Sequence, residues 1–152
     1  MEMTVYKITK PLTKRKTAFV FSGIGAQWKK MGTGLLEADV FQKAVEKCDR
    51  EFRRIAGISV TEMLSGETVH SQSVTANPCM LAVQLGLAAM LEQRGIRPDG
   101  IIGHSTGEFA ATCLSGVLPL ETICEILWQH CLLMKGITTP GAMAHLSVSE
   151  EQ

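Results

Sequence analysis

The sequence predicts an α/β fold built around a parallel sheet, and three observations support this prediction. Strand-like and helix-like apolar periods alternate along the 152 residues. The run TAFVF at 17–21 passes directly into a glycine turn, residues 22–27. A second short apolar run, Ile101-Ile102, passes into another glycine-bounded turn and then into a helical period. Strand, turn and helix in this order are typical of the units that build parallel sheets.

The first strand and first helix follow from local pattern. Residues 17–21 are almost entirely apolar, as expected of a strand that is covered on both faces. A helix is expected from Phe41 to Ile55, because apolar residues recur there at spacings of three and four along one stripe. Gly57 follows as its stop, and residues 58–76 are expected to form a loop or short turns.

Asn77-Pro78 is expected to open the next helix, with Asn77 as the N-cap and Pro78 at the first helical position. The pattern continues to Arg94 and stops at Gly95, and it is apolar nearly all round, which predicts a buried helix. Its longest apolar block, residues 79–91, is shorter than the roughly 20 residues of a membrane span. No membrane association is therefore expected.

The remaining elements are short. Ile101-Ile102 is expected to form a strand after a Pro-Asp-Gly turn. Two further helices, each ended by glycine, and one weakly alternating strand are then predicted at 108–115, 121–135 and 142–148.

The strand supply suggests an incomplete fold. The three candidate strands fall short of the roughly four to six usual in a sheet. The last four residues, 149–152, match the S-x-x-Q capping box that announces a helix start. We therefore expect a basic lead-in at 1–16, a partial α/β core at 17–141 and the start of a smaller, incomplete subdomain at 142–152.

Composition excludes several classes of protein. The 45% hydrophobic content excludes disorder, and 15 Lys+Arg against 15 Asp+Glu leave no basic footprint for nucleic acid. No secretory signal is expected. The five cysteines form no CxxC pair and favour buried thiols in a reducing compartment, so we expect a cytoplasmic location. Cys124, His130 and Cys131 lack the spacing of a zinc site, and no metal is expected.

The pattern Gly103-x-Ser105-x-Gly107 is that of a nucleophile elbow. Such a serine sits on a strained turn between a strand and a helix, and the helix start directs free N–H groups at developing negative charge. The Thr106 N–H would be one oxyanion donor. The glycine turn would supply the other, because parallel strands place both turns at their carboxyl ends. A tight turn in which Ser105 merely caps the helix is the alternative.

Three segments together resemble the acyltransferase domain of polyketide and animal-type fatty acid synthases, and the related malonyl-CoA:acyl carrier protein transacylases. FSGIGAQW at 21–28, GHSTGE at 103–108 and PGAMA at 140–144 are similar to that family's FPGQGSQ, GHSxGE and GAM patterns. The resemblance runs from about residue 17 to 152. It implies an α/β-hydrolase-like core that leads into a ferredoxin-like subdomain.

The resemblance also implies a mechanism. Ser105 would take an acyl group from coenzyme A as an ester and pass it to the phosphopantetheine thiol of an acyl carrier protein. The backbone N–H groups of Ile24 and Thr106 would form the oxyanion hole. His104 and Gln27 fall in the motifs and are implied in substrate binding. Acyl-coenzyme A is a substrate and no tightly bound cofactor is implied. The expected partners are the carrier protein, other synthase domains or a chain that supplies the C-terminal half.

Two features depart from the family. Its base histidine lies in a downstream part that these residues do not match, and His70 and His145 are interpreted as surface or loop histidines. His130 stands where the malonyl-type enzymes carry an arginine that pairs with the substrate carboxylate, which a neutral histidine cannot do. We interpret this as preference for an acyl group without a carboxylate. A plain core or pocket-lining histidine, or a replacement base, are the alternatives.

Two other classes remain open. A non-catalytic remnant or interaction module would explain both departures. A serine hydrolase requires an acid and then a histidine after the nucleophile, and only 47 residues follow Ser105.

Overall fold

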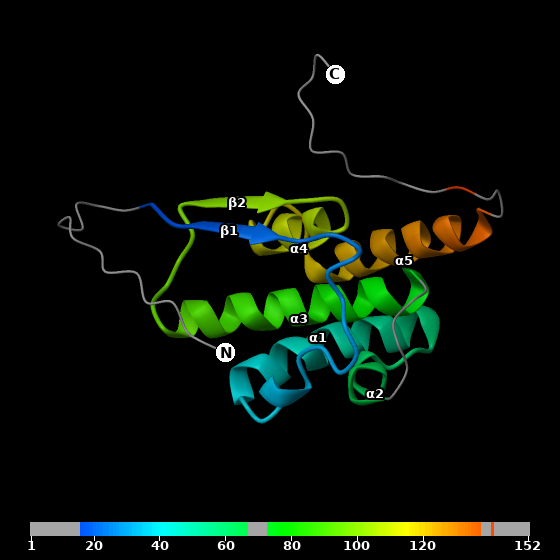
Figure 1. Ribbon diagram of the computed structural model, residues 1–152, viewed down its shortest axis with the longest axis horizontal. Coiled ribbons are helices and arrows are strands. Elements are labelled where there is room, and N and C mark those ends of the chain that lie inside the picture. The colour runs from blue at the N-terminus through cyan, green and yellow to red at the C-terminus, as the bar shows by residue number, and fades with distance from the viewer. Residues whose placement is uncertain (1–15, 67–72, 138–140, 142–152) are drawn as a thin grey trace, which may run out of the picture.

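The computed structural model describes residues 16–66, 73–137 and 141. Figure 1 shows two strands lying side by side above a layer of helices, in which α3 and α1 run beneath the sheet. This mixture of helices and parallel strands confirms the predicted α/β class. In chain order the elements are β1 (Ala18–Phe21), the short 3-10 helix η1 (Thr33–Leu35), α1 (Asp39–Ala56), α2 (Val60–Ser65), α3 (Ser73–Gln93), β2 (Gly100–Gly103), α4 (Gly107–Leu114) and α5 (Leu120–Gly136).

The two strands pair in parallel, from Ala18 opposite Gly100 to Phe21 opposite Gly103. Both strands were predicted, and the parallel pairing is confirmed. The carboxylate of Asp99 fixes the start of the pair, because it accepts a hydrogen bond from the Thr17 N–H at 2.7 Å. Since both strands point the same way, the turns that follow them lie at the same edge of the sheet.

The described residues cover one face of the sheet. Phe19 and Phe21 are buried against the helices, whereas Val20 is 68% exposed and its partner across the strands, Ile102, is 57% exposed. The expectation that the first strand is covered on both faces is therefore wrong for the described part of the chain. An apolar run signals burial, but it does not say which neighbours supply it.

Helix α1 confirms the predicted amphipathic stripe, since Phe41, Val45 and Phe52 are at most 1% exposed. Gly57 ends it in the left-handed conformation, with φ of 66°. Helix α3 can approach α1 closely because of Gly86. A methyl group there would lie 2.6 Å from the Phe41 Cδ2.

Helix α2 lies in the segment that was expected to be loop or short turns. Ser59 caps it, because the Ser59 Oγ accepts a hydrogen bond from the Glu62 N–H at 3.2 Å. The spacing S-x-x-E is that of a capping box, so a local signal was present in the sequence. Six residues are too few for a clear apolar period, which explains why the pattern did not reveal the helix.

Helix α3 begins at Ser73, five residues before Pro78, its expected first helical position. Asn77 is therefore not an N-cap. It is a helical residue, 2% exposed, whose Nδ2 donates to the Cys131 Sγ at 3.5 Å. Pro78 also lies inside the helix. Because proline has no N–H, the hydrogen bond to the Val74 carbonyl, four residues earlier, is absent from this helix.

Because α3 is longer than expected, it reaches the length of a membrane-spanning helix. Val74–Gln93 is long and apolar enough to cross a bilayer, by length and composition alone. Of this window, 56% is buried inside the fold, where α3 packs against α1 and α5. A core helix meets the same length criterion, so this is weak evidence for a span. Burial is uneven, because Leu87 and Leu91 near its C-terminal end are exposed.

The last two described helices match their predictions within one residue at each end. Gly116 adopts a φ of 75° after α4, as expected of a helix-ending glycine. The strand predicted at 142–148 and the capping box at 149–152 lie outside the described residues and stay predictions. The same holds for the proposed division at residue 141.

Candidate active site

Ser105 occupies a strained turn between β2 and α4. Its φ is 55°, in the left-handed region that side chains rarely adopt. Hydrogen bonds on both sides hold the turn. The His104 N–H donates to the Phe21 carbonyl at 2.9 Å, and the Glu108 N–H donates to the Ser105 carbonyl at 3.0 Å. The residue is exposed, so the strain presents a hydroxyl group to solvent instead of burying it.

The glycines of the motif, Gly103 and Gly107, lie where two backbone segments approach closely. A methyl group on Gly103 would collide with the backbone of Glu108, and one on Gly107 would collide with the Phe21 carbonyl. Helix α4 can therefore start directly against the ends of β1 and β2 only with glycine at these positions. Close packing of this kind is expected of a nucleophile elbow. Moreover, the residue at the N-cap position of α4 is Thr106, not Ser105.

The glycine turn after β1 lies against Ser105. A methyl group on Gly23 would lie 2.7 Å from the Ser105 Cβ and 3.3 Å from its Oγ. Within the turn, the Gly25 N–H donates to the Gln27 Oε1 at 2.7 Å. Gln27, predicted to bind substrate, thus directs its amide oxygen onto its own loop. The two turns that were predicted to meet at the carboxyl edge of the sheet do meet.

Ile24 and Thr106 directly follow the two residues in contact, Gly23 and Ser105. Their backbone N–H groups have no hydrogen-bond acceptor in the described part of the chain. They are the two predicted oxyanion donors. Thr106 immediately precedes α4, where the helix dipole also favours negative charge. The Ile24 side chain is 48% exposed and points no polar group at the site.

Of the four histidines, the structure describes His104 and His130. His104 is exposed beside the nucleophile. His130 packs against Phe109 on α4, with ring centroids 5.8 Å apart and planes tilted by 54°. Its Nδ1 is buried without a partner among the described residues, as is the Thr106 Oγ1. His70 and His145 lie outside the described residues.

No described side chain forms a hydrogen bond with the Ser105 hydroxyl. The cysteines are poor competitors as nucleophiles, since burial raises the pKa of both Cys48 and Cys79 to about 12. Across residues 16–66 and 73–137, no group of three or more His, Cys, Asp or Glu side chains could hold a metal ion.

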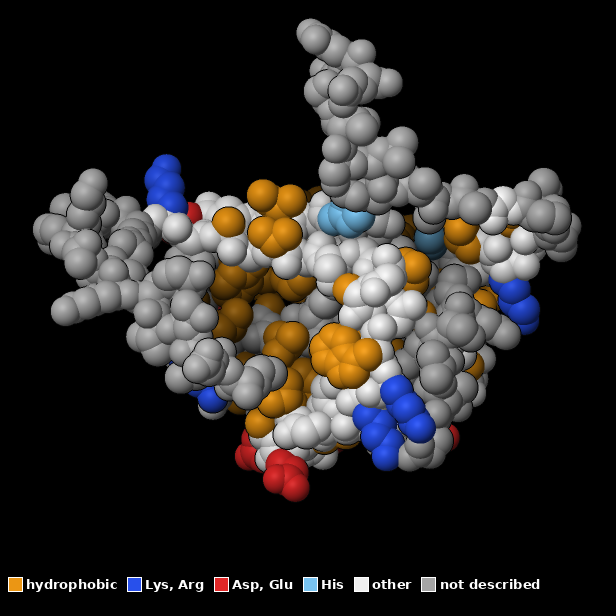
Figure 2. Space-filling view, in the orientation of Figure 1, with side chains coloured by type: hydrophobic (Ala, Val, Ile, Leu, Met, Phe, Trp, Pro, Cys, Tyr) orange, Lys and Arg blue, Asp and Glu red, His pale blue; other side chains and the backbone are white. Residues whose placement is uncertain are grey.

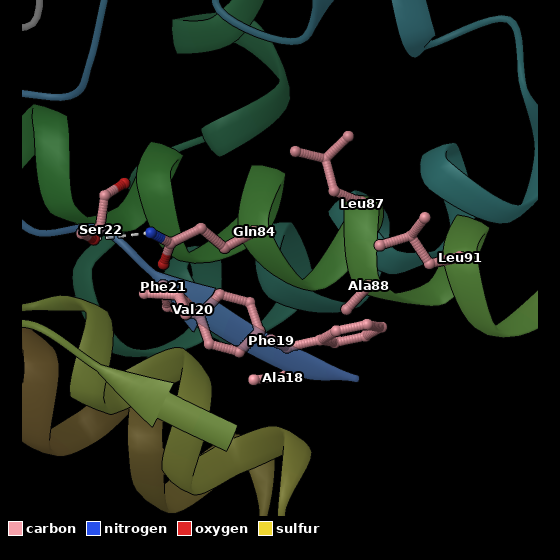
Figure 3. A pocket seen from close by; sticks show the side chains of 9 residues that line it. All are labelled: Ala18, Phe19, Val20, Phe21, Ser22, Gln84, Leu87, Ala88 and Leu91. Carbon is pink, nitrogen blue, oxygen red and sulfur yellow. Dashed lines mark hydrogen bonds between the residues drawn. The ribbon is translucent and has the colours of Figure 1, made fainter. Parts of the chain in front are cut away.

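An apolar groove opens beside the glycine turn. It has a volume of about 330 Å³ and lies between β1 and α3 (Figure 3). Gln84 closes its end next to the site, because its Nε2 donates to the Ser22 carbonyl at 2.7 Å. Figure 2 shows apolar side chains lining this hollow below the sheet. No local sequence pattern points to Gln84 or Phe109, since both act through contacts distant in sequence.

Comparison with known proteins gives a consistent result. A family model described as an acyl transferase domain matches residues 18–152. Erythronolide synthase EryA3 of Saccharopolyspora erythraea is 33% identical over 143 residues, which are 93% of this chain and 4% of that protein. Probable polyketide synthase 2 of Dictyostelium discoideum is 32% identical over 140 residues, 88% of this chain and 5% of that protein.

Solved structures agree. A loading acyltransferase from the avermectin modular polyketide synthase superposes with a TM-score of 0.72 at 33% identity, over 76% of this chain and 38% of that one. The malonyl-CoA:ACP transacylase of Synechocystis sp. PCC 6803 gives a TM-score of 0.69 at 29% identity, over 79% and 40%. The chain thus spans 4–5% of these two curated proteins and 38–40% of these two solved chains.

Proposed function

This chain belongs to the acyl transferase domain family, and we propose that it moves an acyl group from coenzyme A to an acyl carrier protein through an ester on Ser105. The process it would serve is fatty acid or polyketide synthesis. The observation that carries the proposal is the left-handed Ser105 on the turn between β2 and α4, in contact with Gly23 of the glycine turn.

The proposed reaction has two halves. In the first, the Ser105 oxygen attacks the thioester carbon, the C–S bond breaks, and coenzyme A leaves as its thiol with the proton that the hydroxyl loses. In the second, the carrier's phosphopantetheine thiol attacks the ester carbon. The C–O bond breaks, and Ser105 regains a proton as the acyl thioester forms.

The backbone supplies the electrostatic part of this chemistry. Negative charge develops on the acyl oxygen in both halves, and the N–H groups of Ile24 and Thr106 would donate to it. Because backbone N–H groups do this work, an isoleucine side chain at 24 is compatible with it. Removing one such donor typically costs about 100- to 1000-fold in rate.

The general base that would accept the Ser105 proton is not assigned among the described residues. An alcohol is a weak nucleophile at neutral pH without a base. No described histidine contacts the Ser105 hydroxyl, so the proposal assigns the base to residues outside the described ones or to a second chain. A non-catalytic remnant is the competing interpretation, and the absence of a described base contact is the observation that favours it.

The acyl group is proposed to lack a carboxylate. His130 packs on Phe109, whose N–H donates to the Thr106 carbonyl at 3.3 Å. Thr106 directly follows the proposed nucleophile. An arginine guanidinium is always charged and can donate two parallel hydrogen bonds to a carboxylate. A neutral imidazole can donate only one. An acetyl group or a longer unsubstituted chain fits this chemistry better than malonyl.

Intact mass spectrometry tests the proposal. The full chain is incubated with acetyl-coenzyme A or malonyl-coenzyme A, with Ser105→Ala as the matched control and circular dichroism to establish folding. We expect an acyl adduct that requires Ser105 and forms faster from acetyl-coenzyme A. A folded chain that gives no adduct from either donor supports the remnant interpretation and overturns ours.

A further inference from the structure

Three consecutive side chains project from the loop that follows the glycine turn. Trp28 is 61% exposed, and Lys29 and Lys30 are exposed beside it. We call these three residues the basic rim. A tryptophan this exposed adds little to the hydrophobic core. Exposed aromatic side chains next to positive charge are typical of binding sites. The chemistry proposed for Ser105 uses none of the three.

Buried contacts of the next two residues, Met31 and Gly32, hold the basic rim in place. Met31 is 4% exposed, and its N–H donates to the Trp28 carbonyl at 3.2 Å. Gly32 has a φ of 78° and lies so close to α1 and α3 that a methyl group there would be 2.9 Å from the Val83 Cγ2. The loop is therefore fixed by buried contacts while its outer side chains face solvent, which lowers the entropy cost of binding.

A small pocket lies between the basic rim and the start of the glycine turn. It has a volume of about 80 Å³, and its lining includes Trp28, Met31 and Ser22. The next residue after Ser22 is Gly23, which lies against Ser105. Trp28 is five positions after Gly23, so the two lie within about 18 Å even if the loop were fully extended. The pantetheine arm of coenzyme A is a linker suited to such a separation.

We propose that the basic rim binds the nucleotide end of coenzyme A. The adenine stacks on Trp28 and the phosphates lie against Lys29 and Lys30, while the pantetheine arm follows the small pocket toward Ser105. Every base presents a face that can stack on an aromatic ring, and ammonium groups bind phosphate as point charges. Figure 2 shows basic side chains beside apolar ones at the margin of the hollow. The identity of the ligand rests on the proposed acyltransferase function.

Fluorescence titration tests the basic rim without any acyl transfer. The chain has two tryptophans, so Trp128→Phe leaves Trp28 as the single reporter. Coenzyme A, adenosine 3′,5′-bisphosphate and pantetheine are titrated separately. We expect saturable quenching by the first two and none by pantetheine, with affinity that falls as salt rises from 50 to 500 mM because exposed charges are screened.

Matched charge variants locate the site. Lys29→Ala with Lys30→Ala is expected to weaken coenzyme A binding roughly tenfold, while the Arg variants at both positions retain it. Lys43→Ala with Lys47→Ala removes the same charge from exposed positions on α1 and should leave affinity within about twofold. Absence of nucleotide quenching, or equal weakening by both pairs, overturns the proposal.

The outcomes separate this proposal from the function itself. If acetyl-pantetheine and acetyl-coenzyme A acylate Ser105 equally well and no nucleotide quenches Trp28, the basic rim is not a nucleotide site but the acyl transfer stands. If nucleotides bind as expected, also in Ser105→Ala, but Ser105 is never acylated, the nucleotide site stands and the acyl transfer fails.

Discussion

Gly23 and Ser105 lie in direct contact, although 82 positions separate them in the chain. A methyl group on Gly23 would come within 2.7 Å of the Ser105 Cβ and 2.8 Å of the His104 carbonyl oxygen. Real side-chain contacts are not this short, so either the turn or the elbow would have to move. The parallel pairing of β1 with β2 brings the two together, because both strands end at the same edge.

Gly23→Ala should therefore damage the site more than the fold. Displacing the glycine turn by a few tenths of an ångström moves the Ile24 N–H away from the place where an acyl oxygen would sit. We expect Ser105 acylation to slow at least 100-fold, the scale of losing an oxyanion donor. Gly34→Ala is the matched control, since a methyl group there meets nothing within 4 Å. Equal rates in the two variants would contradict this prediction.

The strained φ of Ser105 makes a second prediction, about stability. Replacing a left-handed residue by glycine relieves about 1–2 kcal/mol of backbone strain, partly offset by the greater entropy of glycine in the unfolded chain. We expect Ser105→Gly to be more stable than Ser105→Ala by about 1 kcal/mol in urea unfolding. Glycine is normally the less stable of the two. The normal order at 105 would show that the elbow is not strained in solution.

Local sequence signals predicted the secondary structure around Ser105 better than the tertiary contacts that surround it. The strand, turn and helix around Ser105 and the stripe on α1 follow from glycine positions and apolar spacing, both of which are local. Asn77 was misplaced because Asn-Pro reads as a helix start when only its neighbours are considered. Its partner, Cys131, is 54 residues away, and such tertiary contacts override local propensity.

Non-local contacts also explain the remaining differences. Nothing near Val20 in sequence reveals that its face of the sheet is exposed, since that depends on which elements pack there. Gln84 holds the Ser22 carbonyl across 62 positions, and His130 meets Phe109 across two helices. These contacts surround the candidate site, whereas the residues proposed to react come from short motifs.

The interpretation of His130 predicts a change in donor preference. His130→Arg places a permanent positive charge beside Phe109, and that charge would favour a substrate carboxylate. We expect the ratio of malonyl to acetyl transfer to Ser105 to rise at least tenfold. His130→Gln removes the imidazole without adding charge and should leave the ratio unchanged. If arginine and glutamine variants behave alike, position 130 does not read the carboxylate.

The thiols are expected to be inert in the native protein. Burial raises the pKa of Cys48 and Cys79 to about 12, so about one in ten thousand of each is thiolate at pH 8. Ellman's reagent should label neither in the folded chain and should label all five cysteines in 6 M guanidinium. Peptide mapping after a short labelling pulse identifies the modified positions. Rapid native labelling of Cys48 or Cys79 would show that the core opens.

A buried carboxylate joins α1 to α2, and it predicts how stability depends on pH. Asp49 accepts hydrogen bonds from Arg53 Nε at 2.7 Å, from Ser59 Oγ at 2.8 Å and from the Thr61 N–H at 2.9 Å. Burial alone would raise the pKa of Asp49, but these hydrogen bonds outweigh it and hold the pKa below its usual 3.8. The charged form is therefore favoured in the folded state.

A lowered folded-state pKa contributes stability above the unfolded pKa, and this contribution is lost as pH falls through 3.8 toward the folded value. Asp49→Asn should cost about 1–3 kcal/mol at pH 7, because it leaves buried donors without a charged acceptor. Between pH 5 and 3 the variant should lose less stability than the parent, so the two curves converge. Urea unfolding across this range measures both. Glu92→Gln, an exposed carboxylate near the end of α3, is the control that should track the parent. Parallel curves for Asp49→Asn and the parent would mean that Asp49 is not linked to folding through its proton.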